Sequence, residues 1–187
     1  MILPVVAYGL PILRKKAIEI DKNFPKLQEL IENMYETMYA ANGVGLAAPQ
    51  INQSIRLIVI DAPSANKEEK TIFKKVLINP LILKTEGEEW AYNEGCLSIP
   101  DIHEDVFREA VVHIQYYDEN FKFFQETYSG IIARIIQHEY DHIEGKLFVD
   151  HLTPLKKMLL KRKLQEISSG EIETKYKMIF PHLKKKR

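Results

Sequence analysis

The chain has 187 residues, of which 45% are hydrophobic and 28% charged, a composition typical of a globular domain with a sizeable core. We expect one domain over residues 1–187, in which 154–187 form a basic C-terminal helix and tail. The single cysteine excludes an internal disulfide and favours a reducing compartment, so a cytoplasmic protein is expected. No apolar run approaches the ~18 residues of a membrane span, and the basic residues 14–16 follow the apolar N-terminus, the reverse of a secretory signal.

The formal net charge is zero, but the charge is unevenly distributed along the chain. Residues 156–187 hold 11 Lys and Arg against 3 Glu, a balance of +8, and the remainder holds 15 basic against 23 acidic residues, a balance of −8. A basic arm on an acidic body favours an anionic partner such as RNA. A solvated basic helix with a frayed tail explains the same composition without a partner, so both interpretations stay open.

The predicted elements mix helices and strands without regular alternation. Residues 25–41 have the apolar spacing of an amphipathic helix, and residues 43–50 follow as a loop of small and apolar residues ending in Gln50. Strand-like patterns cover 56–61, 73–79, 111–117 and 121–127, with a polar turn at 64–70. Two further helices are expected at 129–144 and 154–168. This order of elements predicts an α+β fold.

The helix predicted at 129–144 carries the sequence His-Glu-Tyr-Asp-His at 138–142. Histidines at i and i+4 project from one face, so His138 and His142 can reach one divalent ion, with Glu139 beside its open position. Cys96, 42 residues before His138, supplies a third ligand, the number that a catalytic site uses when it keeps one position free. The pattern indicates metal-assisted hydrolysis.

The His-Glu-x-x-His segment and Cys96 also have simpler interpretations. A chain of this length contains His-Glu-x-x-His by chance less than about 1% of the time, in which case the segment is a surface helix with solvated charges. Ile131 and Ile135 share the helical spacing of His138 and His142, which places the histidines on a core-facing stripe where they need partners. An unpaired cysteine is most often an inert buried residue, so Cys96 is informative only through its neighbours.

Three segments, at 43–50, 94–98 and 137–142, resemble in this order the signature motifs of bacterial-type peptide deformylases: Gly-Val-Gly-Leu-Ala-Ala-Pro-Gln, Glu-Gly-Cys-Leu-Ser and Gln-His-Glu-Tyr-Asp-His. Residues 9–17 are similar to the N-terminus of that family, and the resemblance extends to about Ser168. It implies antiparallel β-sheets packed around a central metal-binding helix, followed by a C-terminal helix. It also implies removal of the N-formyl group from the formylmethionine that begins new polypeptides, with release of formate.

The resemblance assigns the metal to Cys96, His138 and His142, with water as the fourth ligand. The activated water attacks the formyl carbon, and Glu139 takes its proton and later delivers a proton to the departing amine. The family implies Fe2+, although Cys and His ligands bind Zn2+ more tightly, and Zn2+, Ni2+ or Co2+ are expected substitutes. Iron beside a thiolate predicts sensitivity to oxygen.

The resemblance also assigns residues to the formyl oxygen and to the substrate. Gln50 and the backbone N–H of Leu97 face that oxygen, although Gln50 alone also fits a loop-ending polar residue. The family pairs an extended nascent peptide with the backbone of a segment that matches 44–46 here, namely Val44, Gly45 and Leu46. Val44, Ile131 and Ile135 are candidates for the methionine slot, and plain core packing explains the two isoleucines equally well.

Some positions depart from the family or leave alternatives. His103 lies near a position where many relatives carry a substrate-facing arginine, and Arg108 fits a structural basic position with Glu94 as a partner. Asp141 and Gln137 either orient the metal ligands or are ordinary polar helix positions. Residues 156–163 have a charge similar to the helix by which some relatives dock at the ribosome, which makes the ribosome a candidate partner.

Two other functions compete with deformylation. A zinc endopeptidase needs a downstream ligand, and Glu166, in a lysine-rich helix, is a poorer third ligand than Cys96. A non-catalytic relative that only binds peptide or the ribosome is the second alternative. All the residues to which the resemblance assigns a role in the reaction are present, which argues against this alternative: Gln50, Cys96, Leu97, His138, Glu139 and His142.

Overall fold

The computed structural model describes residues 1–63 and 72–181. The helices are α1 (Leu27–Ala40), α2 (Gly130–Ile143) and α3 (Pro154–Ser168), with short 3-10 helices η1 (Pro11–Arg14), η2 (Ala48–Ile51) and η3 (Phe148–His151). The strands are β1 (Val5–Val6), β2 (Gly45–Ala47), β3 (Leu57–Pro63), β4 (Ile72–Cys96), β5 (Ile99–Tyr117), β6 (Phe123–Ser129) and β7 (Met178–Ile179). None of the helices in these ranges is both long enough and apolar enough to cross a membrane.

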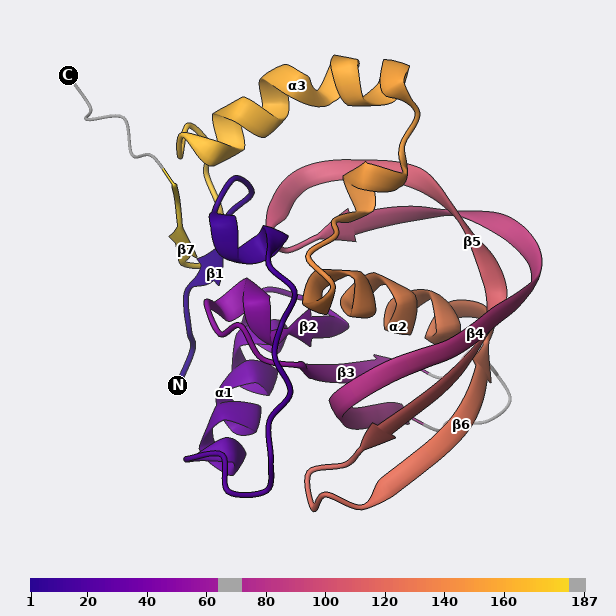
Figure 1. Ribbon diagram of the computed structural model, residues 1–187. Helices are drawn as coiled ribbons and strands as arrows, with labels where there is room; N and C mark the ends of the chain where they lie inside the picture. Colours follow the sequence, from indigo (N-terminus) through magenta and orange to yellow (C-terminus); the bar gives the residue numbers. More distant parts are fainter. Residues whose placement is uncertain (64–71, 182–187) are drawn as a thin grey trace.

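Five strands form one antiparallel sheet in the order β2-β3-β4-β5-β6, and β1 pairs with β7 in a separate two-stranded parallel sheet. The long strands β4 and β5 form a hairpin whose pairing shifts register at four places. Such irregularities bend a strand pair and increase its twist. The hairpin accordingly curves around α2, which lies at the centre of the molecule (Figure 1).

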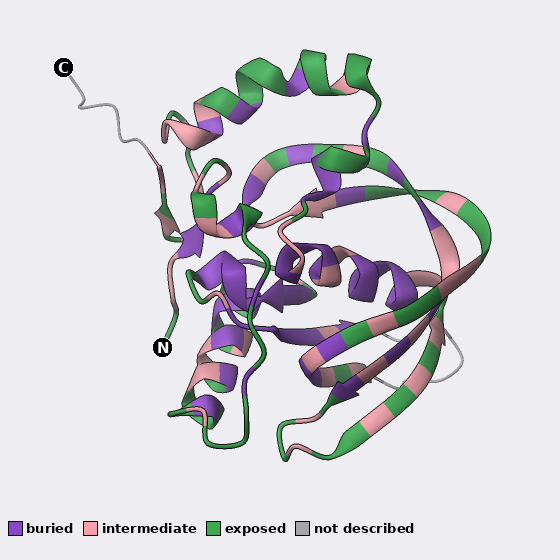
Figure 2. Cartoon of the chain, viewed as in Figure 1, coloured by how far each residue is buried: buried purple, intermediate pink, exposed green. Residues whose placement is uncertain are grey.

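The two faces of the sheet are covered by different helices because side chains alternate along β3. Ile58 and Ile60 pack in the cluster that contains α2, whereas Leu57 and Val59 pack in the cluster that contains α1. All four side chains are fully buried. Most of α2 is buried, as Figure 2 shows, so this helix can hold its side chains in fixed positions.

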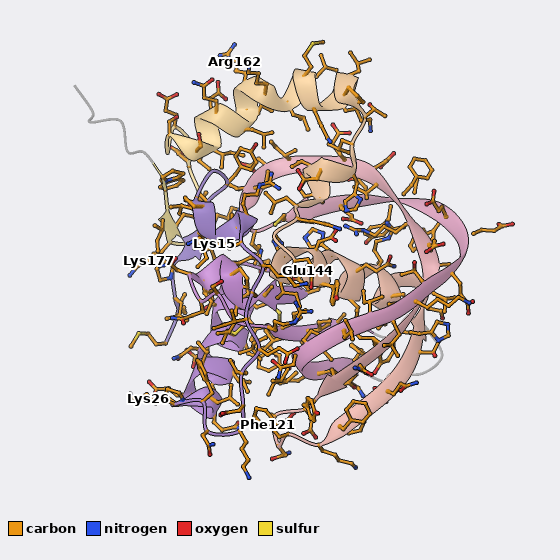
Figure 3. The ribbon with its side chains drawn as sticks, in the orientation of Figure 1. Lys15, Lys26, Phe121, Glu144, Arg162 and Lys177 are labelled. Atoms are coloured by element: carbon orange, nitrogen blue, oxygen red, sulfur yellow. The ribbon has the colours of Figure 1, made fainter. Side chains whose placement is uncertain are left out.

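A third apolar cluster joins α3 and η3 to the N-terminal segment of the chain. Leu160, Leu164 and Ile167 of α3 pack there with Phe148 of η3. The outer face of α3 is exposed, and Arg162 points away from the body of the molecule (Figure 3). Thr153 caps the helix by accepting a hydrogen bond from the Lys156 N–H, which explains its sharp N-terminal boundary.

The predicted α+β fold is confirmed, with an antiparallel sheet around a central helix and a C-terminal helix. The predicted helices agree with the structure to within two residues at each end. Prediction failed for residues 80–96 and 99–110, which belong to β4 and β5, and for β1 and β7, and the loop expected at 43–50 contains β2 and most of η2. The turn predicted at 64–70 lies outside the described residues.

Candidate metal centre and substrate cleft

Three side chains that could hold a metal ion meet between α2 and the end of β4. Cys96, His138 and His142 each offer a ligand atom, and these atoms all lie within 4.8 Å of one another. Among them, Cys96 Sγ and His142 Nε2 lie 3.3 Å apart. One sulfur and two imidazole nitrogens suit Zn2+ or Fe2+ better than hard cations such as Mg2+. The donor set and its geometry therefore fit the metal expected from the sequence.

The environment of the cysteine favours its metal-binding form. Burial alone would raise the pKa of the Cys96 thiol, but His142 and His138 beside it lower this pKa to about 5. The thiolate is the form that coordinates a metal. Cys96 pairs with Ile99 across the β4–β5 turn, so the turn holds the sulfur in place beside α2.

A buried carboxylate orients the first histidine. Glu94 Oε2 lies 2.9 Å from His138 Nδ1 and also accepts a hydrogen bond from Arg108 Nη2, while Oε1 accepts bonds from Arg108 Nε and Arg134 Nη1. Burial opposes ionisation, but the bonds from His138 and Arg108 hold the pKa of Glu94 well below its usual range. A carboxylate on Nδ1 directs the other ring nitrogen, Nε2, towards the Cys96 side.

Arg108 extends this network to a second carboxylate on α2. Its Nη1 donates to Asp141 Oδ2 at 2.7 Å, and His151 of η3 lies 2.7 Å from the same oxygen. The expected pairing of Arg108 with Glu94 is therefore present, and Asp141 supports the same network. Gln137, the other polar residue considered, donates to the backbone carbonyl of Glu109 instead.

The carboxyl group of Glu139 lies buried beside the candidate metal ligands. Burial raises the pKa of Glu139, and its Oε2 has no hydrogen-bond partner among the described residues. A Cβ atom at Gly45 would lie 2.6 Å from Glu139 Oε1, so only glycine leaves room for this carboxyl group. A buried carboxyl group with a raised pKa and a free oxygen is equipped to accept and return a proton.

The side-chain amide of Gln50 is fixed by the backbone of β2. Its Oε1 accepts a hydrogen bond from the Ala47 N–H at 2.9 Å, and its Nε2 faces Cys96 Sγ and Ser98 Oγ at 3.5 and 3.4 Å. Gln50 is almost fully buried. The N–H2 group is thus held as a donor beside the cysteine, and the loop-ending interpretation of this residue does not apply.

A cleft of about 1010 Å³ opens over these groups. Val44, Gly45, Ile131 and Ile135 line it, as the sequence predicted for the substrate. Leu46 is different, because it is fully buried in the α1 cluster, pairs with Val59 of β3 and is not among the residues that line the cleft. β2 is an edge strand of the sheet, and the cleft reaches it at Gly45.

Sequence reasoning missed two features of the site. Arg134, one helical turn before His138, is 2% exposed and donates to Glu94, to the Val106 carbonyl and to the Trp90 carbonyl. The single arginine inside the apolar run at 131–136 was the sequence signal that could have predicted its burial. The C-terminal residues 173–176 also line the cleft, and the alternation of charged and uncharged residues over 171–177 was overlooked.

Comparisons with known proteins agree with this geometry. The family model described as polypeptide deformylase matches residues 2–158. A peptide deformylase of Christiangramia forsetii is 57% identical with full coverage of both chains, and one of Flavobacterium psychrophilum is 54% identical over 95% of this chain and 96% of its own. A crystal structure of a peptide deformylase from Legionella pneumophila has a TM-score of 0.79 and 43% identity, covering 89% of this chain and 95% of its own. The chain therefore belongs to the polypeptide deformylase family.

Proposed function

We propose that this protein is a metal-dependent hydrolase that removes the N-formyl group from the N-terminal formylmethionine of new polypeptides. The observation that carries the proposal is the convergence of Cys96, His138 and His142 within 4.8 Å, beside the buried carboxyl group of Glu139. Family membership supplies the reaction class. The proposed catalytic domain is a single domain that spans residues 1–187.

The metal would be held by Cys96, His138 and His142, and we propose Fe2+ as the ion, with Zn2+, Ni2+ and Co2+ as substitutes. When bound, such an ion lowers the pKa of a coordinated water and polarises a carbonyl oxygen. The thiolate of Cys96 and the carboxylate on His138 make the ligand set electron-rich. This ligand set supports a divalent cation such as iron or zinc.

Glu139 is the proposed acid–base group. Its Oε2 has no partner within the described residues and lies in the buried part of the site, where a water proton can be accepted. The raised pKa of its carboxyl group then suits return of that proton to the amine nitrogen that leaves. Because Gly45 has no side chain, it leaves room for this carboxyl group beside β2.

Gln50 and Leu97 are the proposed donors to the formyl oxygen as it gains negative charge. The Gln50 amide is already oriented by the Ala47 N–H, so it needs no rearrangement during the reaction. The backbone N–H of Leu97 follows the ligand Cys96 directly in the turn. One such donor is typically worth about 2.7–4 kcal/mol of transition-state stabilisation.

The substrate is proposed to bind as an extended peptide along the free edge of β2. Backbone pairing with Val44, Gly45 and Leu46 is independent of side-chain identity, as an enzyme that processes many sequences requires. Ile131 and Ile135 offer an apolar wall for the methionine side chain. A related deformylase from Acinetobacter baumannii, 35% identical with a TM-score of 0.74 over 81% of this chain and 99% of its own, was crystallised with Met-Ala-Ser bound.

The proposed setting is the cytoplasm, where new polypeptides emerge from ribosomes. The exposed basic residues of α3, among them Lys157, Lys161 and Arg162, support the ribosome as a second partner through RNA phosphates. Reversing the charge of these three residues is expected to abolish co-sedimentation with ribosomes. Unchanged co-sedimentation would contradict this part of the proposal.

The alternative functions are less well supported. In a zinc endopeptidase Glu166 would have to bind the metal, but it lies on α3 and accepts a hydrogen bond from Arg162 at the surface. Cys96 lies beside the histidines instead. A non-catalytic relative has no need for a buried carboxyl group such as Glu139 next to the ligands.

Formate release from an N-formylmethionyl peptide tests the proposal, using anaerobically purified protein whose metal is assayed. Glu139→Ala is expected to lower kcat by about 10²–10⁴-fold while the metal stays bound. Glu166→Ala, which removes a glutamate at the surface of α3, is the matched control and should keep full activity. Absence of formate release from metal-loaded wild-type protein would reject the proposed function, and cleavage of internal peptide bonds would indicate an endopeptidase.

A further inference from the structure

The segment after α3 lies beyond residues 2–158, the part matched by the family model, and leads into strand β7. We call residues 171–177 the C-terminal strap. Its even-numbered residues are half-buried and its odd-numbered residues are exposed, the pattern of an extended segment lying on a surface. Ile172 packs on the cluster beneath α3, whereas Lys177 points outward (Figure 3).

Both ends of the C-terminal strap are anchored. At its start, the Glu171 N–H donates to the Glu166 carbonyl at the end of α3. At its end, the Val5 N–H donates to the Lys177 carbonyl at 2.8 Å, where β7 pairs with β1. Figure 1 shows β7 lying beside β1, next to the N-terminal part of the chain. The strap is therefore held across the body of the molecule by bonds that do not involve the cleft.

Between these anchors the C-terminal strap forms part of the cleft. Residues 173–176 line the same cavity as Cys96, Leu97 and Glu139. Tyr176 is one of the half-buried residues of this stretch, and its hydroxyl donates to the Leu97 carbonyl oxygen at 2.7 Å. Burial raises the pKa of Tyr176, so the hydroxyl keeps its proton as a donor.

The two ends of the chain thus hold the turn that carries the cysteine. The Leu97 carbonyl accepts from Tyr176, and the next carbonyl, that of Ser98, accepts from the Tyr8 N–H at 2.8 Å. Two consecutive peptide groups fixed in this way restrict rotation of the Leu97 backbone. The Leu97 N–H, which the proposed function directs at the formyl oxygen, belongs to the preceding peptide group, and this group is confined between Cys96, paired with Ile99 across the turn, and the fixed Leu97 carbonyl.

We propose that Tyr176 is a positioning residue for deformylation: through the Leu97 carbonyl, the C-terminal strap orients the Leu97 N–H towards the formyl oxygen. The inference rests on the proposed function. An oxyanion donor acts through its preorganised geometry, so a looser Leu97 weakens transition-state binding more than ground-state binding. Loss of this positioning should therefore lower kcat and leave KM for the peptide little changed.

Tyr176→Phe tests the inference because it removes one hydroxyl and keeps the ring. Tyr35→Phe is the matched control, since the Tyr35 hydroxyl also donates to a backbone carbonyl, that of Lys75 at 3.0 Å, but on α1 outside the cleft. Both variants are compared with wild type on N-formyl-Met-Ala-Ser, per metal-loaded chain. Hydrogen exchange of the peptide spanning Cys96–Ser98 gives a readout independent of turnover.

For Tyr176→Phe we expect kcat to fall about three- to tenfold with KM within about twofold, the size of effect that one hydrogen bond supports. Exchange at 96–98 should accelerate in Tyr176→Phe and not in Tyr35→Phe. Equal kcat in both variants, or a change confined to KM, would overturn the inference. A wild-type protein that releases no formate would instead reject the proposed function, so the two failures are distinguishable.

Discussion

Replacing Arg108 with methionine removes the charge that joins two buried carboxylates behind the candidate metal centre. Arg108 donates to Glu94 at 2.8 and 3.1 Å and to Asp141 at 2.7 Å, and the side chains of Arg108 and Glu94 are 5% and 3% exposed. Methionine fills similar space but leaves both carboxylates with fewer partners. Breaking a buried pair costs about 3–5 kcal/mol, because one charge remains buried without compensation.

That loss predicts a large change in thermal stability. For a chain of 187 residues, about 2–4 °C of Tm is lost per kcal/mol, so Arg108→Met should lower Tm by roughly 6–20 °C. Calorimetry at a fixed, saturating metal concentration measures this fall in Tm. The metal affinity should fall as well, by about 10–100-fold, since Glu94 orients His138.

Arg162→Met is the matched control for this measurement. Arg162 also pairs with a glutamate, Glu166 at 2.9 Å, but its side chain is 90% exposed. An exposed pair of this kind contributes about 0.3–0.5 kcal/mol. Equal destabilisation by Arg108→Met and Arg162→Met would refute the reasoning, because the predicted difference arises only from burial.

Two further predictions concern the cleft and the sheet. Gly45→Ala would place a Cβ 2.6 Å from Glu139 Oε1, so kcat for formate release should fall about 10²-fold; a wild-type kcat would contradict this. Glu126 accepts hydrogen bonds from Tyr116, Tyr128 and Lys75, which lower its pKa although burial opposes them. Its stabilisation is present above the unfolded pKa of about 4.3 and lost as pH falls through the lower folded pKa, so Glu126→Gln should flatten the decline of Tm below that pH.

Local sequence patterns were enough to predict the helices. The helical spacing of apolar residues predicted α1, and the i, i+4 spacing of His138 and His142 put both rings on one side of α2. These features depend on neighbours within a few residues, so they can be read without knowledge of the fold. The family resemblance, which rests on three separate motifs, is confirmed by the comparisons.

The buried network behind the site was only partly predictable. The pairing of Arg108 with Glu94 was expected, but the contribution of Arg134 was not, because an arginine in a helix is usually exposed. Its burial depends on the curved β4–β5 hairpin, which supplies the Trp90 and Val106 carbonyls. The extent of that hairpin was missed, since polar and charged residues are frequent in 84–95 and 101–109 and do not alternate regularly with apolar ones.

By itself, the sequence determined the chemical groups of this protein: a thiol, two imidazoles one helical turn apart, and a carboxyl group between them. The tertiary structure decided which distant segments meet those groups. Cys96 reaches the histidines because β4 ends beside α2, and Tyr176 reaches Leu97 because β7 pairs with β1, near the opposite end of the chain. Contacts of this kind depend on the packing of the whole chain, and two paired residues in each of β1 and β7 leave almost no local pattern by which to predict them.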